Sequence, residues 1–400
     1  MRQVFVQLHR WVGLATAGLL IIVGFTGSLL AFNTELERVF APQLFSKAIR
    51  PGPRLDLATL AEKAAALTPA EARVVGITNS EPDQVFVYVE ARSNPETRKP
   101  YDVAFDELYL DPWTGAELGR RKRGDLSQGV VNLMPFLYGL HWRLALGDTG
   151  QWILAVTALA WTIDCFIAFY LTLPQTTVAF WRRWKPAWLI KRKAGFYRLN
   201  FDLHRASGLW LWALLFIFAW SSVMMDWRPA YEAVTRALFD YRSVTTLFDA
   251  LPTGGNGKPT LDWRAALATG ERLMVEQSRQ AGFTVGQPLS LSYVADQNVY
   301  FYEVRGSRDV FERSSKGGGT SVMFDAGSGR FLELSQPTGE RAGNTVESWL
   351  YALHMARVFG MPYRLLVCAL GLVIVALSVT GIYIWWKKRA ARRARLHAAG

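Results

Sequence analysis

Four long apolar runs dominate the pattern of hydrophobic and polar positions along the 400-residue chain. They extend over about Trp11 to Phe32, Gln151 to Leu173, Leu209 to Trp227 and Tyr363 to Trp386. Each run has close to the roughly 20 residues that a helix needs to cross the hydrocarbon of a bilayer. The pattern therefore predicts four transmembrane helices. The first run is too long for the apolar part of a secretory signal and no small-residue cleavage site follows it, so we expect it to remain as an anchor.

The segments after the first and third runs have the pattern of small water-soluble folds. After the first run we predict a helix from Leu57 to Leu67 with Asp56 as its N-cap, strands at Val74 to Thr78, Val85 to Glu90 and Phe105 to Leu110, and a turn at Asp111 to Gly115. After the third run the same order returns, with a helix near Asp262 to Ala281, strands near Leu289 to Val294, Val299 to Val304 and Ser321 to Phe324, and a turn at Asp325 to Gly329. Each segment is predicted to be an α+β module with its own antiparallel sheet.

An apolar segment stands between each module and the next run, at Val130 to Leu146 and at Val346 to Phe359. Each segment is apolar nearly all round and stops before a glycine, Gly147 or Gly360. A segment of this length that ends at glycine is expected to be buried at the outer membrane interface instead of crossing the bilayer.

These elements predict an integral membrane protein, an α-helical bundle of four spans built from a duplicated two-span unit, with two small α+β modules. In chain order we expect transmembrane helix 1 (1–32), module 1 (33–129), an interfacial helix with transmembrane helix 2 (130–173), a basic loop (174–200), transmembrane helix 3 (201–227), module 2 (228–345), an interfacial helix with transmembrane helix 4 (346–386) and a basic tail (387–400).

The net charge of +12 is distributed unevenly along the chain. The loop from Pro174 to Asn200 has seven Lys or Arg and no acid, and the tail after Trp386 has six and no acid, whereas the two long loops are nearly balanced. The positive-inside rule therefore predicts that both termini and the short loop are cytoplasmic and that both modules lie outside. Basic residues beside helix ends set topology or bind lipid headgroups, so the charge requires no nucleic-acid partner.

Part of the sequence occurs twice. Leu8-His9-Arg10, with Gly13 beyond it, returns as Leu203-His204-Arg205 with Gly208, and Tyr138-Gly139-Leu140-His141 returns as Tyr351-Ala352-Leu353-His354. The chain has five histidines, and four of them occupy these equivalent positions. The duplication should relate the halves by a pseudo-two-fold axis. It predicts one pair, His9 and His204, at the cytoplasmic ends of the spans and a second pair, His141 and His354, at the outer ends.

Two opposed imidazoles in a helix bundle are the ligands of a six-coordinate b-type haem, and the duplication predicts two such sites. Gly13 and Gly208 would let a flat macrocycle lie against the backbone. Four arginines near the pairs are candidate partners of the haem propionates: Arg10, Arg205, Arg143 and Arg357. The competing interpretation is that each histidine is a structural residue at a helix end. Zn²⁺ or Cu⁺ would need three or four clustered donors, and Cys165 and Cys368 occupy non-equivalent positions.

Asp164 lies inside the second predicted span, where a carboxylate is costly and commonly functional. Three roles are open at this stage: the partner of an arginine, the acceptor that orients a ligand histidine, or a proton relay.

The chain resembles the PepSY-associated transmembrane family. The resemblance rests on the opening Leu8-His9-Arg10-Trp11-Val12-Gly13-Leu14, on the Leu-His before the second and fourth spans, on the turns at Asp111 to Gly115 and Asp325 to Gly329, and on the closing Thr380-Gly381-Ile382-Tyr383-Ile384-Trp385-Trp386. Within the family, Asp164-Cys165 and Phe169 to Pro174 are similar to the iron-uptake branch, the FoxB-type siderophore-iron reductases.

The resemblance implies a protein of the bacterial inner membrane with haem in a four-helix bundle and PepSY modules in the periplasm. It would reduce Fe³⁺ in a siderophore to Fe²⁺, with electrons from a quinol or a cytoplasmic reductase. No catalytic acid, base or nucleophile is then expected, because the cofactor carries the chemistry. The alternative function is non-enzymatic: a membrane-anchored PepSY protein that binds peptides or regulates a peptidase. A transporter is disfavoured because the repeats run parallel and the spans have few polar residues.

Overall fold

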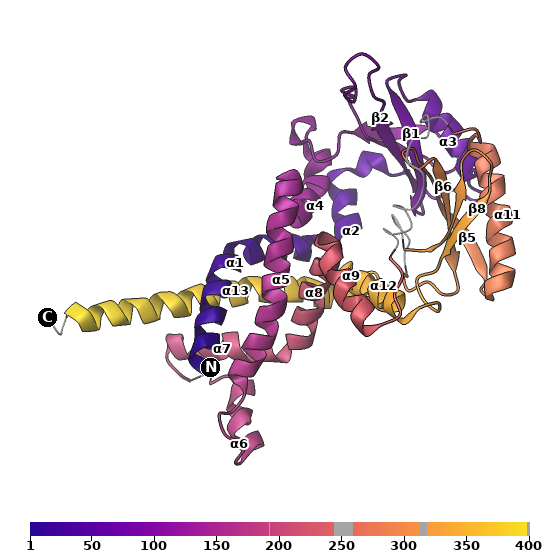
Figure 1. Ribbon diagram of the computed structural model, residues 1–400. Coiled ribbons are helices and arrows are strands. Elements are labelled where there is room, and N and C mark those ends of the chain that lie inside the picture. The colour runs from indigo at the N-terminus through magenta and orange to yellow at the C-terminus, as the bar shows by residue number, and fades with distance from the viewer. Residues whose placement is uncertain (192, 244–258, 313–317, 398–400) are drawn as a thin grey trace. The chain divides into compact units, whose positions relative to one another are not determined.

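The chain folds into two compact units in a computed structural model that describes residues 1–191, 193–243, 259–312 and 318–397 (Figure 1). Unit 1 comprises Met1–Phe32, Leu137–Val234 and His354–Gly400, and unit 2 comprises Asn33–Phe136 and Thr235–Leu353. Residue 192 of the predicted basic loop, residues 244–258 and 313–317 of the predicted second module, and residues 398–400 of the predicted tail lie outside the described residues.

Unit 1 is helical. Its helices are α1 (Arg2–Leu30), α5 (Gly147–Thr172), α6 (Phe180–Trp184), η4 (Lys185–Trp188), α7 (Phe196–Trp210), α8 (Trp212–Asp226) and α13 (Gly360–His397). Three further helices contain the points where the chain passes from one unit to the other: α4 (Leu133–Arg143), α9 (Arg228–Leu238) and α12 (Ala342–His354). Within the described ranges, α1, α5 and α13 are each long and apolar enough to cross a membrane. The chain is therefore a membrane-associated helical protein with three candidate spans.

The predicted third span is not one straight helix. The chain bends by 70° between α7 and α8, at Leu211, so a fourth span exists only if this bent pair is counted as one. The part of the predicted span that forms α7 carries charge, since Asp202 is fully buried between Arg198 and Arg205, and charged side chains are costly in hydrocarbon. A hydrogen bond to α5 fixes the chain next to the bend: the indole N–H of Trp212, the first residue of α8, donates to the carbonyl of Cys165 on α5 at 2.8 Å.

Helices α1 and α13 approach closely through small residues. A Cβ added at Gly371 would lie 2.4 Å from the carbonyl oxygen of Gly24 and 2.3 Å from Ser28 Oγ. The hydroxyl of Ser28 donates across the contact to the carbonyl of Cys368 at 2.9 Å. Glycine at a membrane helix contact permits this backbone approach and the dispersion contacts that come with it.

Unit 2 contains one antiparallel sheet of eight strands in the order β4-β3-β2-β1-β5-β6-β7-β8. The strands are β1 (Ala72–Glu81), β2 (Gln84–Ala91), β3 (Glu107–Leu110), β4 (Glu117–Arg121), β5 (Val285–Val294), β6 (Val299–Gly306), β7 (Thr320–Asp325) and β8 (Phe331–Ser335). The expectation of two separate sheets was wrong, because β1 and β5 pair and join the two four-stranded halves. This pairing removes two exposed strand edges, which would otherwise leave backbone groups without partners.

The helices α3 (Leu57–Ala66) and α11 (Trp263–Ala281) pack on one face of the sheet and form a single core with alternate residues of β2, including Val85, Val87 and Val89. Each helix begins with an aspartate cap, as predicted for Asp56: its carboxylate accepts the backbone N–H of Thr59 at 2.7 Å, and Asp262 does the same for Ala265 at 2.8 Å. On the other face, Phe86 and Tyr109 form a smaller cluster with Ala41, Leu44 and Phe45, which lie in and beside η1 (Pro42–Leu44), just after α2 (Asn33–Phe40).

The two outermost strands, β4 and β8, were not predicted from the sequence. Both have only five residues, and β4 carries Glu117, Arg120 and Arg121; short length and charge are two ways in which edge strands resist pairing with other chains. The turns before them were predicted correctly. Asp111 and Asp325 each accept two backbone N–H groups of the following turn, and Gly115 and Gly329 adopt positive φ angles of 66° and 71°. Each turn therefore closes a hairpin, from β3 to β4 and from β7 to β8.

Candidate functional site

The helices that carry His141 and His354 end beside these residues, as the glycines at 147 and 360 predict. Helix α4 ends at Arg143 and α12 at His354, and the following spans begin at Gly147 and Gly360. Both links contain residues other than glycine with positive φ, namely Leu144, Ala145, Ala356 and Phe359. Such backbone costs energy and persists only where packing fixes it. The two links therefore hold their histidines at defined places on the ends of α4 and α12.

The four repeated histidines form the two pairs that the duplication predicts. The ring centroids of His9, on α1, and His204, on α7, are 6.1 Å apart with an angle of 61° between the rings. The ring centroids of His141 and His354 are 6.3 Å apart with an angle of 62°. The near identity of the two geometries follows from the duplication of the sequence.

In the first pair, both Nδ1 atoms act as donors. His9 Nδ1 lies 2.9 and 3.0 Å from the two carboxylate oxygens of Asp164, on α5, and a carboxylate accepts. His204 Nδ1 lies 3.0 Å from the carbonyl oxygen of Leu377 and 3.0 Å from Thr380 Oγ1, both on α13. A carbonyl oxygen can only accept, so Nδ1 of His204 carries a proton.

The second pair has hydroxyl groups in the same position. His141 Nδ1 lies 3.0 Å from Thr26 Oγ1, and His354 Nδ1 lies 2.7 Å from Ser221 Oγ. Thr26 donates its own proton to the carbonyl of Ile22 and Ser221 donates its proton to that of Phe218. Each hydroxyl oxygen is therefore left to accept from the imidazole, and Nδ1 is again the protonated nitrogen.

With the proton on Nδ1, the neutral form of each imidazole carries its lone pair on Nε2, which is the nitrogen that a metal ion would take. Two metal–imidazole bonds of about 2 Å place the centroids of two opposed rings about 6 Å apart. The observed separations of 6.1 and 6.3 Å match that requirement. Among the residues that the structure describes, no group of three or more His, Cys, Asp or Glu could hold a metal ion by itself. The donor set therefore fits haem iron, whose macrocycle supplies the other four ligands.

Glycines line the histidines in two different ways. A Cβ added at Gly13 would meet no atom within 4 Å, and one added at Gly208 would first meet Leu377 at 3.8 Å, so both predicted glycines have space beside them. Two others contact the imidazoles directly: an added Cβ would lie 3.0 Å from His141 Cε1 at Gly27 and 3.3 Å from His204 Cε1 at Gly381. These two glycines allow α1 and α13 to pass close to the rings.

The predicted propionate partners differ in their surroundings. Arg10 follows His9 on α1 and is partly buried. Arg205 donates to the carboxylate of Asp202 at 2.8 Å and to the carbonyl of Pro186 at 2.6 Å, so it already holds α7 to η4. Arg143 lies over the ring of Trp142, 3.8 Å from its centroid, and 3.6 Å from Asp148. For Arg357 and the other three, a role at a propionate stays a prediction.

Most of the acceptors of the histidine N–H groups were not predicted from the sequence, although the repeat contains a signal for two of them. The spacing of 195 residues between His9 and His204 also separates Thr26 from Ser221. Aligning the two halves would therefore have found both hydroxyls.

The same alignment relates Asp164 to Leu377. The 213 residues between His141 and His354 also separate Asp164 from Leu377, which offers only its backbone carbonyl. Of the roles left open for Asp164, the structure places it against a histidine. Thr380 was noted in the sequence only as part of the closing motif.

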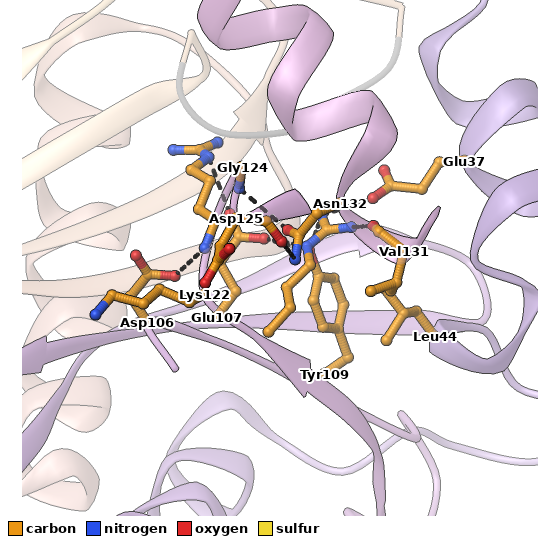
Figure 2. A network of polar contacts seen from close by, with 12 residues as sticks. Glu37, Leu44, Asp106, Glu107, Tyr109, Lys122, Gly124, Asp125, Val131 and Asn132 are labelled. Carbon is orange, nitrogen blue, oxygen red and sulfur yellow. Dashed lines mark hydrogen bonds and ion pairs between the residues drawn. The ribbon is translucent and has the colours of Figure 1, made fainter. Parts of the chain in front are cut away.

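A second buried polar cluster lies in unit 2 and links α2 to the sheet (Figure 2). Arg121 lies 2.7 Å from Glu107 and 2.6 Å from Glu37 and donates to the carbonyl of Val131, and Tyr109 donates to Glu107 at 2.8 Å. Burial alone would lower the pKa of Arg121, but the neighbouring charges hold that pKa above its ordinary value, while burial raises the pKa of Tyr109. Arg123 also lies 3.1 Å from Glu107, so two arginines face two glutamates and we interpret the cluster as structural.

The fold and the histidine pairs define a class of protein: a membrane-associated helical unit with two opposed histidine pairs, joined to a sheet of duplicated origin. The chain belongs to the PepSY-associated TM region family, whose sequence pattern matches residues 6–388. The resemblance seen in the sequence is thereby confirmed at the level of the family, and the assignment to its FoxB-type branch stays a prediction. No curated protein matches the chain.

Proposed function

We propose that this chain is a haem-containing reductase of the bacterial inner membrane, which passes electrons across the membrane to reduce Fe³⁺ in a siderophore to Fe²⁺ in the periplasm. The observation that carries the proposal is the pairing of four imidazoles, each with its Nδ1 at hydrogen-bond distance from an acceptor, and with ring centroids 6.1 and 6.3 Å apart within the pairs. His9 and His204 would hold one haem b, and His141 and His354 a second. Bound haem supplies reversible one-electron transfer.

The protein residues would fix the ligands and tune them. The acceptors on α1, α5, α8 and α13 orient the four imidazole rings, which keeps Nε2 of each directed away from its acceptor. The predicted topology, with both termini cytoplasmic, assigns the His9 and His204 pair to the side of the electron donor. The His141 and His354 pair then belongs to the periplasmic side, where the chelate is reduced.

The proposed reaction balances with a donor on the cytoplasmic side. Each Fe³⁺ takes up one electron and becomes Fe²⁺, which siderophore oxygen ligands hold more weakly. A quinol would give up two electrons and two protons and so reduce two ferric ions, whereas a cytoplasmic reductase would deliver the same electrons from its own substrate. The siderophore as substrate is supported by Asp164-Cys165 and Phe169 to Pro174, the residues that are similar to the FoxB-type branch.

The test uses the purified full-length protein, reduced anaerobically with dithionite and freed of excess reductant. Ferric hydroxamate and ferric catecholate siderophores are then added, and haem oxidation is followed by visible absorbance while Fe²⁺ is trapped with a colorimetric chelator. We expect about one Fe²⁺ for each haem oxidised, and neither signal from the double variant H204A/H354A. Haem that stays reduced with every chelate would contradict the reductase. A protein that binds no haem would leave the peptide-binding alternative as the better interpretation.

A further inference from the structure

The two histidine pairs are alike in geometry but differ in charge. Equivalent positions of the repeat supply their N–H acceptors, and three of the four histidines bond to neutral groups: Thr26, Ser221, and the carbonyl of Leu377 with the hydroxyl of Thr380. Only His9 bonds to a carboxylate, that of Asp164. The position of the repeat equivalent to Asp164 is occupied by Leu377. The duplication is therefore broken at the acceptor of His9, which is charged where its equivalent is not.

The carboxylate of Asp164 is held close to His9 and away from water. Its side chain is 11% exposed, and both of its oxygens lie within 3.0 Å of His9 Nδ1. In the described part of the chain, His9 is the one basic side chain within 4.0 Å of it. The negative charge is thus directed at a single imidazole and is not cancelled by an arginine. The low dielectric of a helix bundle makes such a charge felt strongly by its neighbours.

A carboxylate on the N–H of a ligand histidine makes that histidine a stronger donor, and a stronger donor stabilises the more oxidised metal. We infer that Asp164 is a positioning residue that gives the His9 and His204 site a lower reduction potential than the His141 and His354 site. The inference rests on the proposed function. It deepens that function by fixing the direction of electron flow, because an electron then moves downhill from the first site to the second.

The test is a redox titration of the purified full-length protein, followed by its visible spectrum, with Asp164→Asn as the informative variant. This change keeps the shape of the side chain and removes its charge. We expect two one-electron components in the wild type, of which the lower belongs to the His9 and His204 site. In D164N the ferrous-to-ferric ratio of the lower component at a fixed potential should rise on the order of tenfold or more. For a one-electron couple, each tenfold change corresponds to about 59 mV.

Two further variants control for structure. Thr26→Val removes an uncharged acceptor at the His141 and His354 site. It should change only the reduction potential of the higher component, and by less than D164N changes that of the lower component. Asp164→Glu keeps the carboxylate and should keep a low component. If D164N fails to retain haem at the first site, D164E becomes the informative variant. A reduction potential at its first site below that of the second site supports the inference, and a potential equal to that of the second site overturns it.

Three results would overturn the inference: a D164N titration that matches the wild type, a shift of both components by the same amount, or equal potentials in D164N and D164E. In each case haem is still bound, so the proposed function survives without this inference. A wild-type protein that lacks haem would instead remove the proposed function, and measuring haem per chain before each titration separates the two failures.

Discussion

Replacing Gly371 with alanine tests how the packing of α1 on α13 supports the second histidine pair, His141 and His354. An added Cβ would lie 2.4 Å from the Gly24 carbonyl oxygen and 2.3 Å from Ser28 Oγ, whereas ordinary Cβ contacts begin at 3.4 Å. The two helices therefore have to separate by about 1 Å, and overpacking of this kind typically costs about 1–3 kcal/mol. The separation would also stretch the hydrogen bond from Ser28 to the carbonyl of Cys368.

The consequence should reach the His141 and His354 pair, because Gly24 and Ser28 flank Thr26, the acceptor of His141, and Gly27, where an added Cβ would lie 3.0 Å from His141 Cε1. We expect G371A to lower the unfolding temperature in detergent by a few degrees and to weaken haem retention at that pair. The matched control is Gly18→Ala on α1, where an added Cβ meets no atom within 4 Å and should cause no loss. A G371A protein with the unfolding temperature and haem content of the wild type would refute the proposed importance of this contact.

Three further substitutions test other parts of the structure. Arg121→Met removes the buried guanidinium from Glu37 and leaves Glu107 with Arg123 and Tyr109, and it should destabilise unit 2 by about 3–5 kcal/mol in denaturant unfolding. Its neighbour control, Arg120→Gln, breaks an exposed pair with Glu117 and should cost at most about 1 kcal/mol. Equal losses in the two variants would contradict the buried cluster. Asp56→Ala removes the cap of α3 and should cost about 1 kcal/mol at neutral pH. Although burial raises the pKa of Asp56, the hydrogen bonds from Thr59 bring that pKa below its ordinary value. The cap therefore stabilises the fold fully above the pKa of the unfolded state, and this stabilisation is lost as pH falls through the pKa of the folded state. A stability difference between wild type and D56A that stayed constant down to low pH would be inconsistent with the cap. Trp212→Phe removes the hydrogen bond from the indole N–H to the carbonyl of Cys165 and should lower the stability of the protein by about 1 kcal/mol, measured by thermal unfolding. Trp210→Phe is the control, because it removes an exposed indole hydrogen bond, to the carbonyl of Trp188.

The repeated part of the sequence was the best guide to the structure. It predicted which histidines pair, because equivalent positions of a duplicated chain meet about a pseudo-axis. The Asp56 cap, the turns at Asp111 and Asp325 and the six inner strands were also predicted, since each depends on side chains that are near one another in the sequence.

What could not be predicted depends on contacts between distant segments. The pairing of β1 with β5 joins residues more than 200 positions apart, and neither strand contains a signal for its partner. The bend at Leu211 separates the charged helix α7 from the apolar helix α8, and the hydropathy of the run does not indicate where such a bend falls. The carbonyl acceptor of His204 belongs to Leu377, a residue whose side chain gives no hint of a hydrogen bond.

The measurement that bears most directly on the central claim is a reduced-minus-oxidised visible spectrum of the purified protein with haem quantified per chain, repeated for His9→Ala, His204→Ala, His141→Ala and His354→Ala. We expect about two b-type haems in the wild type, and the loss or altered ligation of one haem in each variant, with the two members of a pair affecting the same haem. A protein made with ample haem that shows no Soret band would contradict the claim, as would four variants that all retain the wild-type spectrum.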